Sequence, residues 1–170
     1  GAFTSLYVSA SDVDKYVSFL RKNSDAFKAI GSSDAGVCIT RSGNQYPGQM
    51  MIWNAFPSVE AAMIGSLKYD PYKATGPISN LRNIKHSTIW KSLKSFRLEP
   101  GHEIVGRFKV KQENISSFVK AMDSLEKEIQ DNGHPDFFNG VFVSIAGGAE
   151  SQTLKVRSCL LYTSDAADER

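Results

Sequence analysis

The three histidines are the first residues to examine for chemistry: His86, His102 and His134. No HxH or HxxxH pair occurs, so the spacing typical of a metal site is missing. Cys38 stands in a strand-like apolar run, where a buried and unreactive thiol is expected. No serine or cysteine has the pattern of a nucleophile elbow, and the Gly-Gly pair at 147–148 lacks the following helix of a nucleotide loop. We therefore predict no metal and find no catalytic constellation.

Aromatic and polar residues around a predicted hairpin are better candidates. The six candidates for ligand binding are Tyr46, Trp53, Asn54, Tyr72, His86 and Trp90. Pockets are mostly apolar with a few polar groups, and Trp53 and Trp90, predicted on neighbouring strands, are candidates to line one. The alternative is that both indoles pack in the core or cover an interface between units, and that Tyr72 only anchors a loop.

The hairpin that positions these residues spans 36–56. Residues 37–42 and 50–56 both alternate with a period of two and are rich in strand-favouring types. Gly43, Asn44 and Pro47 lie between them, and these residue types favour turns over strands. Apolar residues occur on both faces of the second strand, which predicts a sheet with helices on one face and other structure on the opposite face.

The rest of the first half alternates between strand and helix patterns. Residues 3–10 and 87–98 read as strands, and Gly76-Pro77 opens a short helix that ends near residue 84. A helix is predicted from the N-cap Ser11 to about Ile30, weakened at Asn23 and Ser24. Another begins at the N-cap Ser58 and ends before Pro71, because the residue preceding a proline avoids helical angles. Its predicted buried side is Val59, Ala62, Met63 and Leu67.

After a break at Glu99-Pro100-Gly101 the pattern starts again. A strand is predicted over 102–111, a long helix over 112–132, a strand over 137–146 and the start of another over 153–157. A shift of about a hundred residues places Leu6 and Val8 on Phe108 and Val110. The sequence thus predicts an internal repeat of strand–helix–strand–strand–helix–strand, whose second copy stops within its third strand.

This order resembles the dimeric α+β barrel superfamily, the antibiotic-biosynthesis-monooxygenase-like group, over residues 3–157. The predicted fold class is α+β: tandem ferredoxin-like β-α-β-β-α-β units that form an α+β barrel, with the second unit truncated. The predicted domains are 1–99 and 100–158. Residues 159–170, CLLYTSDAADER, resemble a translated sequencing adapter and are expected to be a non-native tail. Cys38 would then be the single native cysteine, which excludes an intrachain disulfide.

The resemblance implies a ligand held between sheet and helices. The main hypothesis is a barrel that binds a small apolar or aromatic molecule; the alternative is a cofactor-independent monooxygenase-like enzyme acting on an aromatic or polycyclic molecule. Haem-binding members of the group use an axial histidine, commonly on a helix. No histidine here is predicted on a helix, so no cofactor is expected. One chain could build the barrel from its two units, or truncation could force pairing into a homo-oligomer.

The composition argues against two classes of binding partner, nucleic acids and membranes. The formal net charge is +2 and the basic residues are scattered, which gives little support for nucleic-acid binding. No apolar run is long enough to cross a bilayer, so no membrane partner is predicted. The chain begins with Gly1 rather than Met, and we expect a fragment or a processed product whose compartment the sequence leaves open.

Overall fold

The computed structural model describes residues 1–145 and 148–161, and its internal contacts divide the chain into two units. Unit 1 comprises Gly1–Lys91 and Ile145–Ala149, and unit 2 comprises Ser92–Ser144 and the residues from Glu150 onward. The predicted division into 1–99, 100–158 and a foreign tail places its first boundary later and stays a prediction. In the part of the chain that is described, no helix is long and apolar enough to span a membrane.

Unit 1 follows the order β-α-β-β-α-β. Its strands are β1 (Ala2–Ser9), β2 (Asp34–Ile39), β3 (Gln49–Phe56) and β4 (Asn83–Ser92). Its helices are α1 (Val13–Lys22), α2 (Asp25–Ala29), α3 (Val59–Lys68), the 3-10 helix η1 (Pro71–Lys73) and α4 (Pro77–Leu81). The strands lie in the order β2-β3-β1-β4, and every neighbouring pair is antiparallel. The predicted hairpin is confirmed, with Val37 opposite Ile52.

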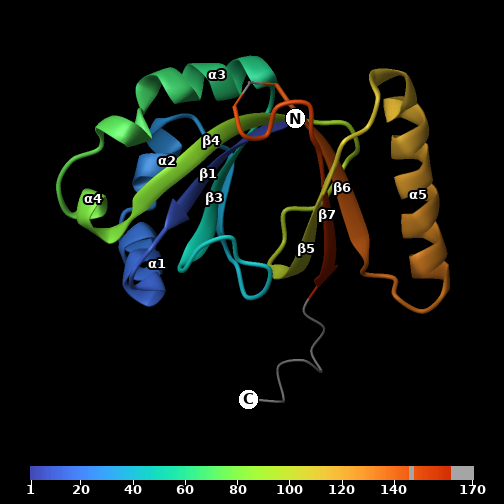
Figure 1. Ribbon diagram of the computed structural model, residues 1–170, viewed down its shortest axis with the longest axis horizontal. Coiled ribbons are helices and arrows are strands. Elements are labelled where there is room, and N and C mark those ends of the chain that lie inside the picture. Colours follow the sequence, from blue (N-terminus) through green and yellow to red (C-terminus); the bar gives the residue numbers. More distant parts are fainter. Residues whose placement is uncertain (146–147, 162–170) are drawn as a thin grey trace. The chain divides into compact units, whose positions relative to one another are not determined.

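The helices of unit 1 lie against one face of this sheet (Figure 1). Strand residues with a period of two supply the floor of the core, including Leu6, Val8 and Ile52, and α1 contributes Tyr16 and Leu20 from above. The helix α3 packs on β1 and β3 through a separate cluster that includes Ala62 and Phe56. The alternation in the strands and the helical spacing in α1 therefore meet in one buried layer.

Three predicted helices differ from the structure. The short helix expected from Gly76-Pro77 to about residue 84 ends at Leu81, because residues from Asn83 onward pair with β1 as strand β4. The helix expected over 11–30 is divided into α1 and α2, because the Asn23 side chain donates to the Phe19 carbonyl at 2.8 Å and closes the first helix there. The N-cap is Asp12 rather than Ser11: its Oδ1 accepts from the Lys15 N–H at 2.9 Å.

In α3 the predicted N-cap Ser58 is confirmed, since its Oγ accepts from the Ala61 N–H at 3.0 Å. The predicted buried side is partly wrong. The buried residues are Ala62 and Gly65, whereas Leu67 is 88% exposed. A Cβ at Gly65 would lie 2.8 Å from the Phe56 ring, so the helix approaches the sheet too closely for large side chains.

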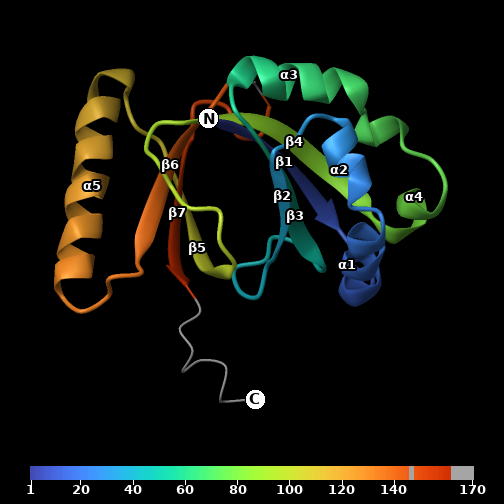
Figure 2. The same cartoon turned by 180° about the vertical axis from the view of Figure 1, so that it is seen from behind.

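Unit 2 contains β5 (Gly101–Phe108), the 3-10 helix η2 (Gln112–Asn114), α5 (Ile115–Asp131), β6 (Phe138–Ser144) and β7 (Leu154–Leu161). Its strands lie in the order β6-β7-β5, with antiparallel neighbours. The helix α5 packs beside β6 (Figure 2). The strand predicted over 87–98 ends at Ser92, and residues 95–100 adopt no helix or strand.

Parts of the predictions fall at or beyond the edge of the described residues. The strand β7 continues through Leu161, so residues 159–161 of the expected foreign tail pair with β5, and 162–170 lie outside the description. Residues 146–147, the end of one predicted strand and half of the Gly-Gly pair, also lie outside it. The α+β class is confirmed. The duplication, the closed barrel and the truncation stay predictions.

Candidate ligand-binding cavities

Three of the predicted site residues share the face of the unit 1 sheet that is opposite to the helices. Antiparallel register places Trp53 and Thr88 on either side of Ser5, and strand alternation adds His86 and Trp90 to the same face. The strand order also corrects one expectation. The strands that carry Trp53 and Trp90 are not neighbours, because β1 lies between them.

Both indoles make packing contacts on this face. Trp90 is fully buried, stacks on Phe3 with ring centroids 6.0 Å apart, and donates from Nε1 to Ser5 Oγ at 2.9 Å. Trp53 lies over the backbone of Gly36 on β2, where an added Cβ would come within 2.4 Å of the indole. His86 stacks on Tyr7, with ring centroids 4.5 Å apart. These contacts agree with the alternative that the two tryptophans serve packing.

The other three predicted residues lie elsewhere in unit 1. Tyr46 is in the loop between β2 and β3, and Lys85 Nζ lies 5.0 Å from its ring centroid. Asn54 lies on the helix-facing side of β3 and donates to Thr4 Oγ1 at 3.3 Å. Tyr72 is exposed in η1. The structure therefore does not gather the six residues into one place, and their role as a site stays a prediction.

A cavity of about 500 Å³ lies between the first two helices and the edge strand β2; we call it the helix-side cavity. Its apolar side chains come from α1, α2 and β2: Val17, Leu20, Phe27, Val37 and Ile39. The break between α1 and α2 adds Ser24 to the lining. A mainly apolar cavity of this size is typical of small-molecule sites.

Charged groups stand among the polar lining of the helix-side cavity. These are Arg21 on α1, Lys28 on α2 and Asp34 at the start of β2. Lys28 pairs with Asp25 at 3.4 Å on an exposed surface, and Asp34 Oδ1 accepts from the Ala35 N–H at 2.7 Å. Arg21 makes no ion pair within the described residues. The cavity thus combines apolar walls with a net positive set of side chains.

A second cavity, of about 610 Å³, lies where β1 ends and β4 begins; we call it the Arg82 cavity. Arg82 donates from Nη1 to Tyr16 Oη at 2.9 Å and from Nη2 to Tyr69 Oη at 2.8 Å. Burial raises the pKa of the Tyr16 hydroxyl, and this outweighs the lowering effect of the Arg82 hydrogen bond and charge. Tyr16 is therefore a neutral partner of the guanidinium at neutral pH.

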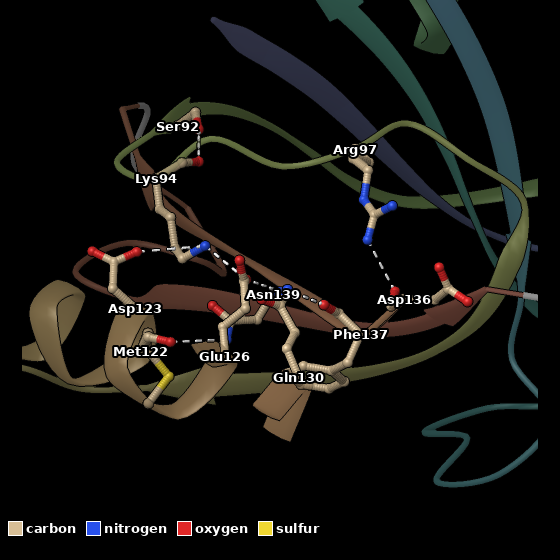
Figure 3. A network of polar contacts seen from close by, with 10 residues as sticks. All are labelled: Ser92, Lys94, Arg97, Met122, Asp123, Glu126, Gln130, Asp136, Phe137 and Asn139. Carbon is tan, nitrogen blue, oxygen red and sulfur yellow. Dashed lines mark hydrogen bonds and ion pairs between the residues drawn. The ribbon is translucent and has the colours of Figure 1, made fainter. Parts of the chain in front are cut away.

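Unit 2 contains a network of polar contacts between α5, β6 and the segment that follows β4 (Figure 3). Lys94 Nζ lies 2.7 Å from Glu126 Oε2 and 3.5 Å from Asp123 Oδ1, both on α5. The same Glu126 oxygen accepts from the Asn139 N–H of β6 at 2.7 Å. This arrangement ties the segment after β4 to α5 and β6. Among the described residues, no group of three His, Cys, Asp or Glu side chains is placed to hold a metal ion.

Comparisons with known proteins give matches to solved structures but none to protein families or curated sequences. No protein-family model matches the sequence, and a sequence search of curated proteins finds no match. A solved structure named "putative monooxygenase" from Fusobacterium nucleatum has a TM-score of 0.52 at 12% identity, over 98% of this chain and 78% of that chain. Another of the same name from Lactobacillus acidophilus has a TM-score of 0.53 at 11% identity, over 98% of this chain and 79% of that chain.

The fold is ferredoxin-like α+β. At these identities the likeness shows the fold alone, and it agrees with the β-α-β-β-α-β order of unit 1. The fold-level part of the predicted resemblance is therefore confirmed, while the activity is a separate question.

Sequence reasoning missed the residues that line both cavities. Val17, Leu20 and Phe27 lie at helical spacing within the helix predicted over 11–30, but that spacing does not reveal where the packing around them is incomplete. Arg82 gave no signal at all, since its partner Tyr16 lies 66 residues away in the chain. Only the fold brings these groups together.

Proposed function

We propose that the protein binds a small apolar or aromatic molecule in the helix-side cavity. The observation that carries this proposal is an apolar cavity of about 500 Å³ between the helix layer and β2. Its volume suits a ligand of one to three rings, and burial against Val17, Leu20 and Phe27 would supply the affinity.

The charged side chains around the cavity indicate which substituent the ligand would carry. Arg21 and Lys28 outnumber Asp34, and Arg21 has no carboxylate partner among the described residues. An apolar ring system that carries a phenolate or another acidic substituent fits this set better than a neutral hydrocarbon, because the substituent can stay in solvent beside Arg21.

Binding can be tested by titrating 2-naphthol into isotope-labelled protein and following methyl shifts by NMR. We expect the largest shifts at Val17, Leu20, Val37 and Ile39. Ser24→Trp places an indole at the break between α1 and α2 and should weaken binding at least tenfold, because it fills the space that the probe would occupy. Ser24 is exposed and its side chain makes no cap hydrogen bond, so the fold should tolerate this change.

Met63→Trp is the matched control. Met63 is exposed on α3 and lies outside the cavity lining, so the same large side chain there should leave the affinity within twofold. Methyl shifts that map to another part of the molecule, or equal affinities for the two tryptophan variants, would contradict the proposal.

A second candidate function is a cofactor-independent monooxygenase acting on a polycyclic phenol with an activated methylene group. The fold shared with two proteins named as monooxygenases supports it, as does a cavity of suitable size. In this reaction the CH₂ group becomes C=O: dioxygen supplies one oxygen atom to carbon, and the other leaves as water with the two hydrogens. Arg21 and Lys28 would stabilise the deprotonated substrate.

Oxygen uptake with a panel of such phenols tests this candidate, with the product mass measured under ¹⁸O₂. Incorporation of one labelled oxygen, lost in Ser24→Trp and kept in Met63→Trp, would support the enzyme. Binding of the phenols without oxygen uptake would leave the binding proposal standing and exclude the monooxygenase for those compounds.

A further inference from the structure

The guanidinium of Arg82 is fixed in place but not neutralised. Its two hydrogen bonds, to Tyr16 and Tyr69, use two of the five N–H donors that an arginine carries. Within the described residues no carboxylate lies at ion-pair distance from it, and no further hydrogen bond is made. Three donors and a full positive charge therefore remain available on a side chain whose position two phenols have already set.

The walls of the Arg82 cavity are built by three separate segments. The end of β1 supplies Ser9, the hairpin loop supplies Gly48, and the α4–β4 junction supplies Asn80 and Asn83 beside Arg82. The loop is tied to the strand, because Ser9 Oγ donates to the Pro47 carbonyl at 2.6 Å and the Ala10 N–H donates to the Gly48 carbonyl at 2.9 Å.

Glycine is required at position 48. Its φ is +67°, and an added Cβ would lie 1.9 Å from the Ala10 carbonyl oxygen. The loop wall of the cavity is therefore held against β1 by backbone contacts, and the position of this wall does not depend on a flexible side chain.

The lining donors match one ligand chemistry. The side chains of Asn80 and Asn83 are exposed, and within the described residues they make no hydrogen bond. Their amides can donate to the same group as the Arg82 fork, which has the geometry to bind two oxygens of a carboxylate or phosphate at once. Asp12 lies in the chain between the lining residues Ser11 and Val13, and its carboxylate is engaged as the N-cap of α1.

We propose that the Arg82 cavity is a binding site for the oxyanion, carboxylate or phosphate, of a small organic molecule. This site is separate from the helix-side cavity, as the two share no lining residue. Arg82 binds two oxygens of the ligand, Asn80 and Asn83 donate at its sides, and the Tyr16 and Tyr69 hydroxyls hold the guanidinium in position.

Phenyl phosphate and benzoate are the probes, titrated by calorimetry at about 50 mM salt, and inorganic phosphate is run beside them. The first two distinguish a phosphate ligand from a carboxylate ligand on the same ring. Arg82→Gln should weaken the preferred probe at least tenfold, since a charge-assisted pair is lost. Arg82→Lys keeps the charge without the fork and should bind severalfold more weakly than the parent.

Arg41→Gln is the matched control, because Arg41 is an exposed arginine outside the cavity lining. Its affinity should stay within twofold of the parent. Asp12→Asn keeps the helix cap but removes a negative charge near Ser11, and should tighten binding about two- to fivefold at this salt.

The outcomes separate clearly. An Arg82→Gln affinity within twofold of the parent, or an equal loss in Arg41→Gln, would overturn the site in favour of general surface attraction. Should Arg82→Gln fail to fold by circular dichroism, Arg82→Lys decides: undiminished binding of both probes would overturn the fork geometry. Retained binding of 2-naphthol in Arg82→Gln would show that the two cavities act independently.

Discussion

The ion pair between Lys94 and Glu126 should contribute far more to stability than the exposed pair Lys127–Asp131 on α5. The Lys94 side chain is 9% exposed and that of Glu126 is 20% exposed, with 2.7 Å between Nζ and Oε2. At an effective dielectric constant near 20, two charges at this distance attract by about 6 kcal/mol, and desolvation offsets much of that. The loss of unfolding free energy in a variant therefore depends on which partner is replaced and on what the remaining partner still contacts.

Glu126→Ala leaves the Lys94 charge nearly buried and also removes the acceptor of the Asn139 N–H. Breaking such a pair costs about 3–5 kcal/mol when the remaining charge has no other partner. Asp123 lies 3.5 Å from Lys94 and still attracts it, so we expect a loss of about 2–4 kcal/mol. Glu126→Gln retains an amide oxygen for the Asn139 N–H, and its cost should be smaller, about 1.5–3 kcal/mol.

A double-mutant cycle isolates the pair, and the chain provides its own control. Lys94→Met combined with Glu126→Gln should give a coupling energy of about 1.5–3 kcal/mol. The Lys127–Asp131 pair on α5 has side chains that are 75% and 62% exposed, and the cycle Lys127→Met with Asp131→Asn should give no more than about 0.5 kcal/mol.

Urea unfolding followed by far-ultraviolet circular dichroism measures both cycles. Both tryptophans belong to unit 1, so fluorescence reports on that unit, and hydrogen exchange of residues 92–100 and 115–131 reports on unit 2. Equal coupling energies for the buried and the exposed pair would refute the reasoning from burial.

Three further predictions concern single side chains in the core. Ser5→Ala removes the acceptor of the buried Trp90 Nε1–H and should cost about 1–2 kcal/mol by fluorescence-monitored urea unfolding; an unchanged midpoint would argue against that hydrogen bond. Because burial raises the pKa of Tyr16 in the folded state, its stabilising contribution is present below the unfolded pKa of about 10 and is lost as pH rises through the folded value. Tyr16→Phe should therefore lose less stability than the parent as the pH rises above about 10, and an identical decline would contradict this. Burial, and secondarily the Glu103 charge, raises the pKa of the Cys159 thiol, so iodoacetamide at pH 8 should label the half-buried Cys38 first, as peptide mass spectrometry can show.

Local patterns explain why much of unit 1 could be predicted. The alternation of Leu6 and Val8 with polar neighbours, and the N-cap at Ser58, are determined by residues close in sequence. The division of the first helix depends on Asn23, whose side chain competes for the Phe19 carbonyl, and propensity alone indicates only a weak point there. The exposure of Leu67 depends on the distance between α3 and the sheet, which no helical spacing encodes.

The candidate site was harder to predict, because a cavity is defined by what the side chains leave unfilled. Aromatic residues such as Trp90 attract attention in a sequence, yet in this fold Trp90 is completely enclosed by packing. The groups that line the cavities are of ordinary types. Arg82 becomes notable only once the structure shows that Tyr16 and Tyr69 hold its guanidinium and that no carboxylate among the described residues pairs with it. Such a property depends on contacts between distant segments.

The two units show separately that an apolar pattern predicts a face but not its burial. In unit 1, α3 packs on β1 and β3, and the core residues of those strands are buried. In the described part of unit 2, α5 packs beside β6, and Phe118 reaches Phe108 on β5 with ring centroids 5.5 Å apart. Ile104 lies on the same face of β5 as Phe108, because the two are four residues apart on a strand, yet it is 78% exposed. Alternation predicts an apolar face around both Ile104 and Leu6, but it does not predict that Leu6 is buried and Ile104 is exposed.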